Sequence, residues 1–592
     1  MKTDLVAFAQ LLLVGALLGL PAATGLLLAI RLGVRSRPVQ GVFALGLPAL
    51  IGYTAVWLYL ASATIGRAFT AAIWVAAVAA GVALFIRASP EDRRALRPWA
   101  LVGAMTVAAA AFSLGLGFLR GTVNGVGGVL PTAQLRYTNF GLPPDAKLPY
   151  LFALQLLSSH RPLPHKLLGS WLSSDRPPLQ SGVYLVMRSV LPYGDPRALL
   201  YQVTGTFLQC LWVPAVWCLF GVMRVPRRAA AIGMVVVLTS GFAIVNSFMV
   251  WPKLFAAAFL VLLVAVIFDT ERAGSRLRMV TGAVCGLAAA MALLGHEGSS
   301  ILLVPLALIV AVFPSRRPGL RPAGAAVLTG AVLMLPWLLY QHYYDPPGDG
   351  LVELAVAGHQ PMGHDPGEVR AVLSAYDHLS AGKAFHNKLV NLETPLSNEP
   401  SEITNLYRVA EHFFSGSTAR NAAVSTLRTD SFFFMLPAMG LFALGPLAWP
   451  IVWWRRRKRG SPGPVAVAAW LWLLLAMTLA FWAVVMFKPR ATVIHEGSYA
   501  IELLFFVAAT SCLWYLSRRL TVVLGIVQSV IAIVVYGFLQ PPARIYLFHS
   551  VGSLGGIGVT ASALWIAGLL SFVVLALMVP PSAALEEAPA TS

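Results

Sequence analysis

Long apolar stretches alternate with short polar segments from one end of the chain to the other. An apolar helix of roughly 17 to 25 residues is needed to cross about 30 Å of hydrocarbon. We expect about fifteen such spans, at 5–31, 40–63, 68–86, 99–119, 198–222, 229–248, 253–268, 279–294, 300–313, 323–340, 431–454, 464–487, 499–516, 520–539 and 557–579. A bilayer core offers no water to free backbone groups, so these stretches should be helical. The pattern predicts an all-α polytopic membrane protein.

Two segments, 120–197 and 341–430, are too polar to cross a bilayer. Both contain short helix-like stretches, which predicts two extramembrane loop regions with short amphipathic helices. We therefore expect four parts in the chain. They are extra transmembrane helices at 1–98, a transmembrane core at 99–340 that includes the first loop, a cap at 341–430, and C-terminal helices with a short tail at 431–592.

Composition agrees with this assignment. Of the 592 residues, 58% are hydrophobic and 11% are charged, and a soluble domain could not bury so much apolar surface. A net charge of +19 would suggest nucleic acid as the partner of a soluble protein. Over half of the 43 lysines and arginines, however, stand in seven short loops, at 31–37, 87–97, 224–228, 272–278, 316–321, 455–459 and 518–519. Because basic residues collect in cytoplasmic loops, the charge indicates topology, and we expect no nucleic acid partner.

The basic loops predict the orientation. If they face the cytoplasm of a bacterial cell, the N-terminus lies outside, the C-terminal tail is cytoplasmic and both long loops lie outside the cytoplasmic membrane. All eleven histidines and most carboxylates then fall on the outer side. This gathering of titratable groups predicts that any chemistry takes place there. The alternative is that the long loops are simply the longest polar segments.

The first loop carries an acidic residue in a distinctive setting. Asp145 follows Pro143-Pro144, and about thirty residues later Arg176-Pro177-Pro178-Leu179 leads back toward the membrane. This layout resembles the first extracytoplasmic loop of the C-type glycosyltransferases (GT-C), such as the lipid A aminoarabinose transferases and the protein O-mannosyltransferases. The resemblance covers residues 99 to 340. The chain departs from the family because the usual motif has two adjacent acids, whereas the neighbour here is Ala146.

The resemblance implies a polyprenyl-phosphate-linked sugar as donor and Asp145 as the base that accepts the acceptor's proton. Asp175 is the nearest candidate for a second acid. An aspartate after prolines is also common as a turn or N-cap residue, and that alternative stays open.

Cations on the outer side are candidates for the donor phosphate. Lys253, in Trp251-Pro252-Lys253, can stabilise a phosphate leaving group, and Arg176 and Arg136 are further candidates. A lysine that extends toward the interface beside an interfacial tryptophan is the alternative.

The tetrapeptide His-Glu-Gly-Ser occurs twice, at 296–299 and 495–498, each time at the outer end of a span. Two copies could place His296, Glu297, His495 and Glu496 around one substrate cavity, which Glu502, inside a span, would also line. Such a set could bind a metal or substrate hydroxyls, and chance recurrence with ordinary helix capping is the alternative. Since the transferases that the chain resembles mostly work without a bound metal, we expect sugar or phosphate contacts and neither a metal nor another cofactor.

These observations predict a membrane glycosyltransferase that moves a sugar from a polyprenyl-phosphate donor to an envelope glycan, lipid or protein on the extracytoplasmic side. The expected partners are the lipid-linked donor, the acceptor and membrane lipids. One alternative is a transporter or flippase of a lipid-linked sugar, although transporters often place broken helices at mid-membrane. A non-catalytic envelope assembly protein is another, and its outer loops would not need coordinated acids.

Overall fold

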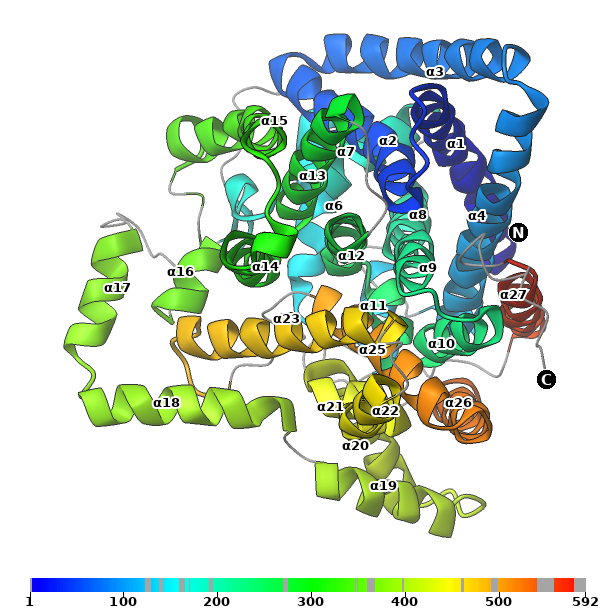
Figure 1. Ribbon diagram of the computed structural model, residues 1–592, viewed down its shortest axis with the longest axis vertical. Coiled ribbons are helices and arrows are strands. Elements are labelled where there is room, and N and C mark those ends of the chain that lie inside the picture. Colours follow the sequence, from blue (N-terminus) through cyan, green and yellow to red (C-terminus); the bar gives the residue numbers. More distant parts are fainter. Residues whose placement is uncertain are drawn as a thin grey trace.

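The computed structural model of the protein is built almost entirely of helices (Figure 1). It describes residues 3–122, 129–137, 142–158, 166–169, 171–190, 195–269, 275–346, 348, 350–358, 368–396, 399–458, 463–490, 499–539 and 558–579. Among these, the only sheet is an antiparallel pair, β1 (Lys166–Leu168) and β2 (Trp171–Leu172), in which Lys166 is paired with Leu172. The protein is therefore an all-helical, multi-pass membrane protein.

The helices of the membrane-embedded body come in three runs along the chain. The first run is α1 (Thr3–Arg31), α2 (Arg37–Ala61), α3 (Ala63–Ile86) and α4 (Pro90–Phe118). The second is α8 (Leu199–Gln209), α9 (Trp212–Val222), α10 (Arg227–Thr239), α11 (Gly241–Met249), α12 (Lys253–Phe268), α13 (Ser275–Gly295), η4 (Glu297–Ser299), α14 (Ser300–Val312), η5 (Pro314–Arg316) and α15 (Leu320–Leu339). The third is α21 (Met435–Met439), η8 (Gly440–Leu444), α22 (Gly445–Lys458), α23 (Gly463–Val485), α25 (Ala500–Leu516), α26 (Arg518–Ile533), η9 (Val534–Phe538) and α27 (Val559–Met578).

The two long loops fold into short helices. The first contains α5 (Leu130–Leu135), η1 (Pro144–Lys147), α6 (Leu148–Leu157), η2 (Ser173–Asp175), α7 (Leu179–Val190) and η3 (Pro196–Ala198). The second contains η6 (Tyr340–Tyr344), α16 (Gly350–Val356), α17 (Glu368–Asp377), α18 (Ala381–Glu393), η7 (Thr394–Leu396), α19 (Glu399–Glu411) and α20 (Thr418–Phe433). In Figure 1, α17, α18 and α19 lie at the margin of the helical body.

The predicted count of about fifteen spans is not confirmed. In the described part of the chain, eleven helices are long and apolar enough to cross a membrane, or twelve if α10 and α11, bent by 56°, form one span. The remaining three predicted spans fold as apolar helices of 10–17 residues, namely Lys253–Phe268, Glu297–Val312 and Ala500–Leu516. At 1.5 Å per residue such helices are shorter than about 30 Å, so their length does not confirm them as full crossings.

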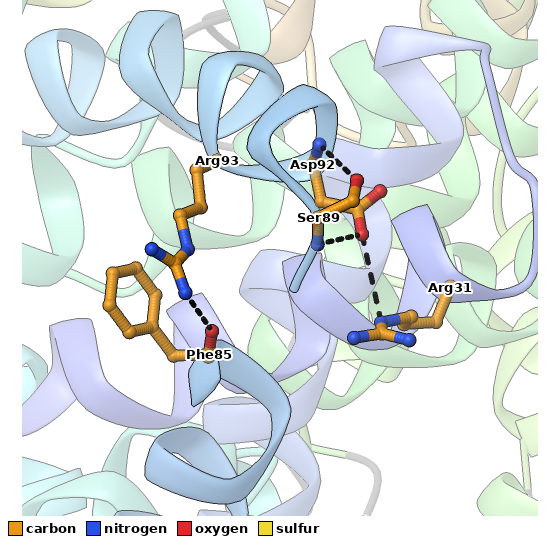
Figure 2. Close-up of polar contacts among 5 residues, drawn as sticks. All are labelled: Arg31, Phe85, Ser89, Asp92 and Arg93. Atoms are coloured by element: carbon orange, nitrogen blue, oxygen red, sulfur yellow. Dashed lines mark hydrogen bonds and ion pairs between the residues drawn. The ribbon is translucent and has the colours of Figure 1, made fainter. Parts of the chain in front are cut away.

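Contacts between basic loops identify one end of the helical body. Asp92, near the start of α4, completes a capping box with Ser89 (Figure 2). Its Oδ2 atom also lies 3.8 Å from Nε of Arg31, at the end of α1. Arg93 donates to the carbonyl of Phe85 at 3.4 Å. Ser36, after α1, donates to Asp269, after α12, at 2.6 Å. The loops that follow α1, α3 and α12 therefore meet at the same end.

The two long loops meet each other as well. The hydroxyl of Ser173, in the first loop, donates to the Asp345 carboxylate at 2.5 Å, and the Ser174 hydroxyl donates to the Asp345 carbonyl at 2.6 Å. Gly350, in the second loop, donates its N–H to Asp175 at 3.1 Å. Lys253 is the first residue of α12, and Asp269, which contacts the basic loops, comes directly after the last residue of this helix. Residues near Lys253 therefore lie at the opposite end of α12 from the basic loops.

Candidate functional site

A buried ion pair joins two of the predicted site residues. Asp145, in η1, is 5% exposed, and Arg176, just after η2, is 3% exposed. The Arg176 guanidinium donates through Nη2 to Oδ2 of Asp145. The other oxygen, Oδ1, has no hydrogen-bond partner among the described residues. Asp145 is therefore both neutralised by a cation and left with one oxygen able to accept a further donor.

His296 extends this pair. It caps the N-terminal end of η4, where its Nδ1 accepts the N–H of Gly298 at 2.9 Å. Its Nε2 lies 3.2 Å from Nη1 of Arg176. Arg176 therefore bridges the first His-Glu-Gly-Ser turn and Asp145, which are far apart in sequence.

Aromatic rings bring Lys253 into the same cluster. The Arg176 guanidinium lies 5.3 Å from the ring centre of Trp171 and 5.7 Å from that of Trp251. Lys253 Nζ lies 4.2 Å from the Trp251 ring and 5.1 Å from the Tyr499 ring. Rings attract cations through their faces, so Trp251 holds two positive charges near one another. Sequence analysis did not identify Trp171 or Tyr499, although Trp171 lies close to Asp175 and Tyr499 directly follows the second His-Glu-Gly-Ser copy.

The turn that presents Lys253 has an unusual backbone. Val250 has φ of 57°, in the left-handed region that a β-branched residue rarely adopts. Its carbonyl accepts the Gln180 side-chain amide at 2.9 Å, and Gln180 in turn accepts from Gln209 at 3.0 Å. Gln209 also accepts the N–H of Phe255 at 3.1 Å. Buried amides from α7 and α8 thus fix the chain on both sides of Trp251 and Lys253, and such strain is commonly found at functional sites.

Glu502 completes the cluster from α25. It is fully buried, and neither carboxylate oxygen has a hydrogen-bond partner among the described residues. The positive charge of Lys253 acts on it. A buried carboxylate is costly in a membrane unless it is paired or lines a polar cavity, so Glu502 belongs with the cationic side of the site.

The three short apolar helices all begin at this cluster. Lys253 is the first residue of α12, His296 precedes η4 and α14, and Tyr499 precedes α25. The N-terminal end of a helix carries a partial positive charge and free N–H groups. Three such ends, with Arg176 and Lys253, offer N–H donors and positive charge to an anion, beside the carboxylates of Asp145 and Glu502.

The other predicted residues lie differently. Both oxygens of Asp175 accept backbone N–H groups, from Leu172 at 2.7 Å and from Gly350 at 3.1 Å. Glu297 is the first residue of η4, directly after His296, and is half-buried. Arg136 is buried near Arg120 and Arg428. Its contacts among the described residues include neither Arg176 nor Lys253. His495 and Glu496, in the second His-Glu-Gly-Ser copy, lie outside the described residues.

An apolar cavity of about 650 Å³ lies within the membrane-embedded helices. Its walls come from α1, α2, α4, α7, α8 and α12, among others. Val183 of α7 and Phe255 of α12 are two of the lining residues. The first of these helices directly follows Arg176-Pro177-Pro178, and the second begins with Lys253. The cavity therefore extends along two helices that begin at the polar cluster.

Groups of three or more histidine, cysteine, aspartate or glutamate side chains that could hold a metal are absent from the described residues. Comparison with known protein families, curated proteins and solved structures finds no match for this chain. The chemistry of the site must therefore be argued from its own residues.

Proposed function

We propose that the protein is a C-type membrane glycosyltransferase, which transfers a sugar from a polyprenyl-phosphate donor to an envelope glycan, lipid or protein. The observation that carries this proposal is the convergence of Asp145, Arg176 and Lys253 at the beginnings of three short helices. Transfer between a lipid phosphate and a hydroxyl needs a carboxylate for the hydroxyl proton and cations for the phosphate. The cluster contains both.

Each residue has a role in this proposal. The Oδ1 atom of Asp145 accepts the proton of the acceptor hydroxyl, which then attacks the anomeric carbon of the sugar. The bond between that carbon and the phosphate oxygen breaks, and the leaving phosphate takes the electron pair. Lys253 and Arg176 stabilise its negative charge, together with the helix ends. His296 orients Arg176.

The donor's hydrocarbon chain needs an apolar place. The cavity of about 650 Å³ supports the proposal because it shares α7 and α12 with the phosphate-binding residues. A phosphate at Lys253 and Arg176 would leave the attached chain close to these walls. The apolar lining favours a prenyl chain over a soluble nucleotide donor.

We propose that the site faces the extracytoplasmic side of a bacterial cytoplasmic membrane. The basic loops that follow α1, α3 and α12 belong at the cytoplasmic face by the positive-inside rule. Lys253 lies at the other end of α12 from Asp269. The donor would then be used on the outer leaflet.

The test is transfer of labelled sugar from polyprenyl phosphate to an envelope acceptor by the purified protein in liposomes. Asp145→Asn should lower the rate per folded molecule by about 10²–10⁴, because an amide cannot accept the proton. Asp377→Asn, which changes an exposed carboxylate at the end of α17, is the matched control and should keep the parental rate.

Three results would contradict the proposal. Parental transfer by the Asp145 variant would remove this residue as the base. A parent that gives no transfer but moves the labelled lipid between leaflets would be a flippase, and one that does neither would be left as an assembly protein.

A further inference from the structure

A second group of cations lies apart from the ion pair of Asp145 and Arg176. It consists of Arg120 after α4, Arg136 after α5 and Arg428 in α20, and we call it the arginine cluster. Arg136 is 2% exposed and Arg428 is 1% exposed, whereas Arg120 is half-buried. Arginines are almost never fully buried without a partner.

Each arginine uses one nitrogen on a helix end. Nη2 of Arg120 donates to the Phe538 carbonyl at 3.0 Å, and Nη2 of Arg136 lies 3.4 Å from the Leu116 carbonyl. Nη2 of Arg428 donates to the Val535 carbonyl at 2.5 Å. These contacts satisfy carbonyls at the ends of α4 and η9, and they explain part of the cluster as helix capping.

Capping leaves most of the donors unused. Nη1 of Arg136, and both Nε and Nη1 of Arg428, are buried and have no hydrogen-bond partner among the described residues. A guanidinium has five N–H donors and no acceptor, so these atoms can donate to an acceptor that enters the cluster.

The charges around the arginine cluster favour the binding of an anion. The pKa of Arg136 and that of Arg428 are both lowered to about 10, chiefly by burial and in smaller part by the neighbouring arginines, while Tyr137 and Tyr536 act in the opposite direction. No carboxylate is among the groups that act on these two arginines within the described residues. The nearby sequence segments outside the described residues, 123–128, 138–141 and 540–557, contain no aspartate or glutamate. Within the described residues, three like charges therefore lie together, and no carboxylate offsets the charges of Arg136 and Arg428.

We propose that the arginine cluster is an anion-binding site that takes a phosphate or pyrophosphate group, separate from the proposed site at Asp145 and Lys253. A planar guanidinium matches phosphate oxygens with paired N–H groups, and several of them suit an anion with more than one charge. The site does not depend on the transfer reaction. It could hold the headgroup of a lipid-linked phosphate or a free one.

The position of the cluster keeps it close to the first site. Tyr137 packs edge-on against Phe248 and Tyr536, with ring centres 6.0 and 5.6 Å apart. Phe248 belongs to α11, whose end leads through Val250 to Trp251. An anion in the cluster would therefore lie near the polyprenyl-phosphate site without sharing its residues.

The experiment measures ligand-induced stabilisation of the full chain in lipid nanodiscs. The probes are inorganic pyrophosphate in solution and a polyprenyl phosphate in the nanodisc. We expect at least one probe to raise the thermal midpoint saturably, with an affinity reduced at least about tenfold by Arg136→Gln or Arg428→Gln. Arg420→Gln, which removes a charge eight residues earlier on α20, is the control and should bind like the parent. Stabilisation by pyrophosphate would identify the ligand of the arginine cluster as a free phosphate. Stabilisation by polyprenyl phosphate alone would identify it as a lipid headgroup.

Two further variants keep the result interpretable. Because Arg120 is half-buried, Arg120→Gln should fold like the parent and still weaken binding severalfold, even if the buried variants fail to fold. Lys253→Met removes a cation of the other site and should leave binding at the arginine cluster intact. Absence of stabilisation by both probes, parental affinity in Arg120→Gln, or complete loss of binding in Lys253→Met would each overturn the proposal.

Discussion

Asp145 and Asp175 lie in the same loop and are both buried, yet their partners differ. Asp145 pairs with a cation through one oxygen, whereas both oxygens of Asp175 accept backbone N–H groups. The second arrangement is typical of an acid that fixes a turn, here the turn before Arg176-Pro177-Pro178. Sequence analysis identified both acids but could not separate them, because Gly350 lies 175 residues beyond Asp175.

The ion pair of Asp145 and Arg176 has a measurable consequence. Removing one partner leaves the other charge buried and unpaired, so Asp145→Asn or Arg176→Gln alone should cost about 3–5 kcal/mol of stability. The double variant should lose less than the sum, because both charges are gone. Thermal unfolding in detergent measures the cycle. Additive losses would mean that the two side chains do not interact. Because the single variants are expected to lose stability, their transfer rates must be expressed per folded molecule.

Asp175 should make stability depend on pH. Burial raises its pKa above the ordinary value of 3.8, although the N–H groups of Leu172 and Gly350 act in the opposite direction. A carboxyl group with a higher pKa in the folded chain binds more protons there than in the unfolded chain. Its contribution to the free energy of unfolding therefore falls as the pH rises from the unfolded pKa to the folded pKa, and is constant above the folded pKa. Asp175→Asn cannot titrate.

We therefore expect the thermal midpoint of Asp175→Asn to fall less steeply than that of the parent from about pH 4 upward. Asp377→Asn, exposed at the end of α17, should keep the parental slope. Identical slopes for the parent and Asp175→Asn would show that this carboxyl group titrates alike in the folded and unfolded chains.

At the scale of elements, close helix contacts position the site. The Cβ of an alanine at Gly182, in α7, would lie 2.0 Å from the carbonyl oxygen of Gly52, in α2. Small residues let helices approach to backbone contact, which is a common packing mode in membranes. Because α7 directly follows Arg176-Pro177-Pro178, its contact with α2 fixes where Arg176 lies. No local sequence pattern predicts this pairing, since glycines occur throughout the spans.

Gly182→Ala should force α7 away from α2. Overpacking of this kind costs about 1–3 kcal/mol, and the shift of Arg176 should also lower transfer. Gly324→Ala is a suitable control, because a Cβ at Gly324 in α15 would meet nothing within 4 Å. Thermal midpoints and transfer rates of both variants are compared with the parent. A Gly182 variant with parental values for both would show that this contact does not position the site.

For the whole molecule, hydropathy located the membrane-span candidates of the described residues but not which of them are long enough for a full crossing. The three that fall short are the three that begin at Lys253, His296 and Tyr499. Hydropathy averages over a window and does not record where a helix stops, so this feature became visible only in the folded chain. The side-chain pairs of the site are equally hidden, because they join segments far apart in sequence.

The contact between the long loops at Ser173–Asp175 and 345–350 places them together, and Lys253 lies at the far end of α12 from the basic loops. If the basic loops are cytoplasmic, cysteines at Lys166→Cys in the first loop and Lys383→Cys in the second should react with an impermeant thiol reagent added to intact cells. Arg457→Cys, in the basic last turn of α22, should react only after the membrane is permeabilised. Background should be low because Cys210, Cys218 and Cys512 are buried and Cys285 is half-buried. Labelling of Arg457→Cys in intact cells would reverse the orientation and place the proposed site in the cytoplasm, whereas labelling that differs between the two loops would contradict their contact.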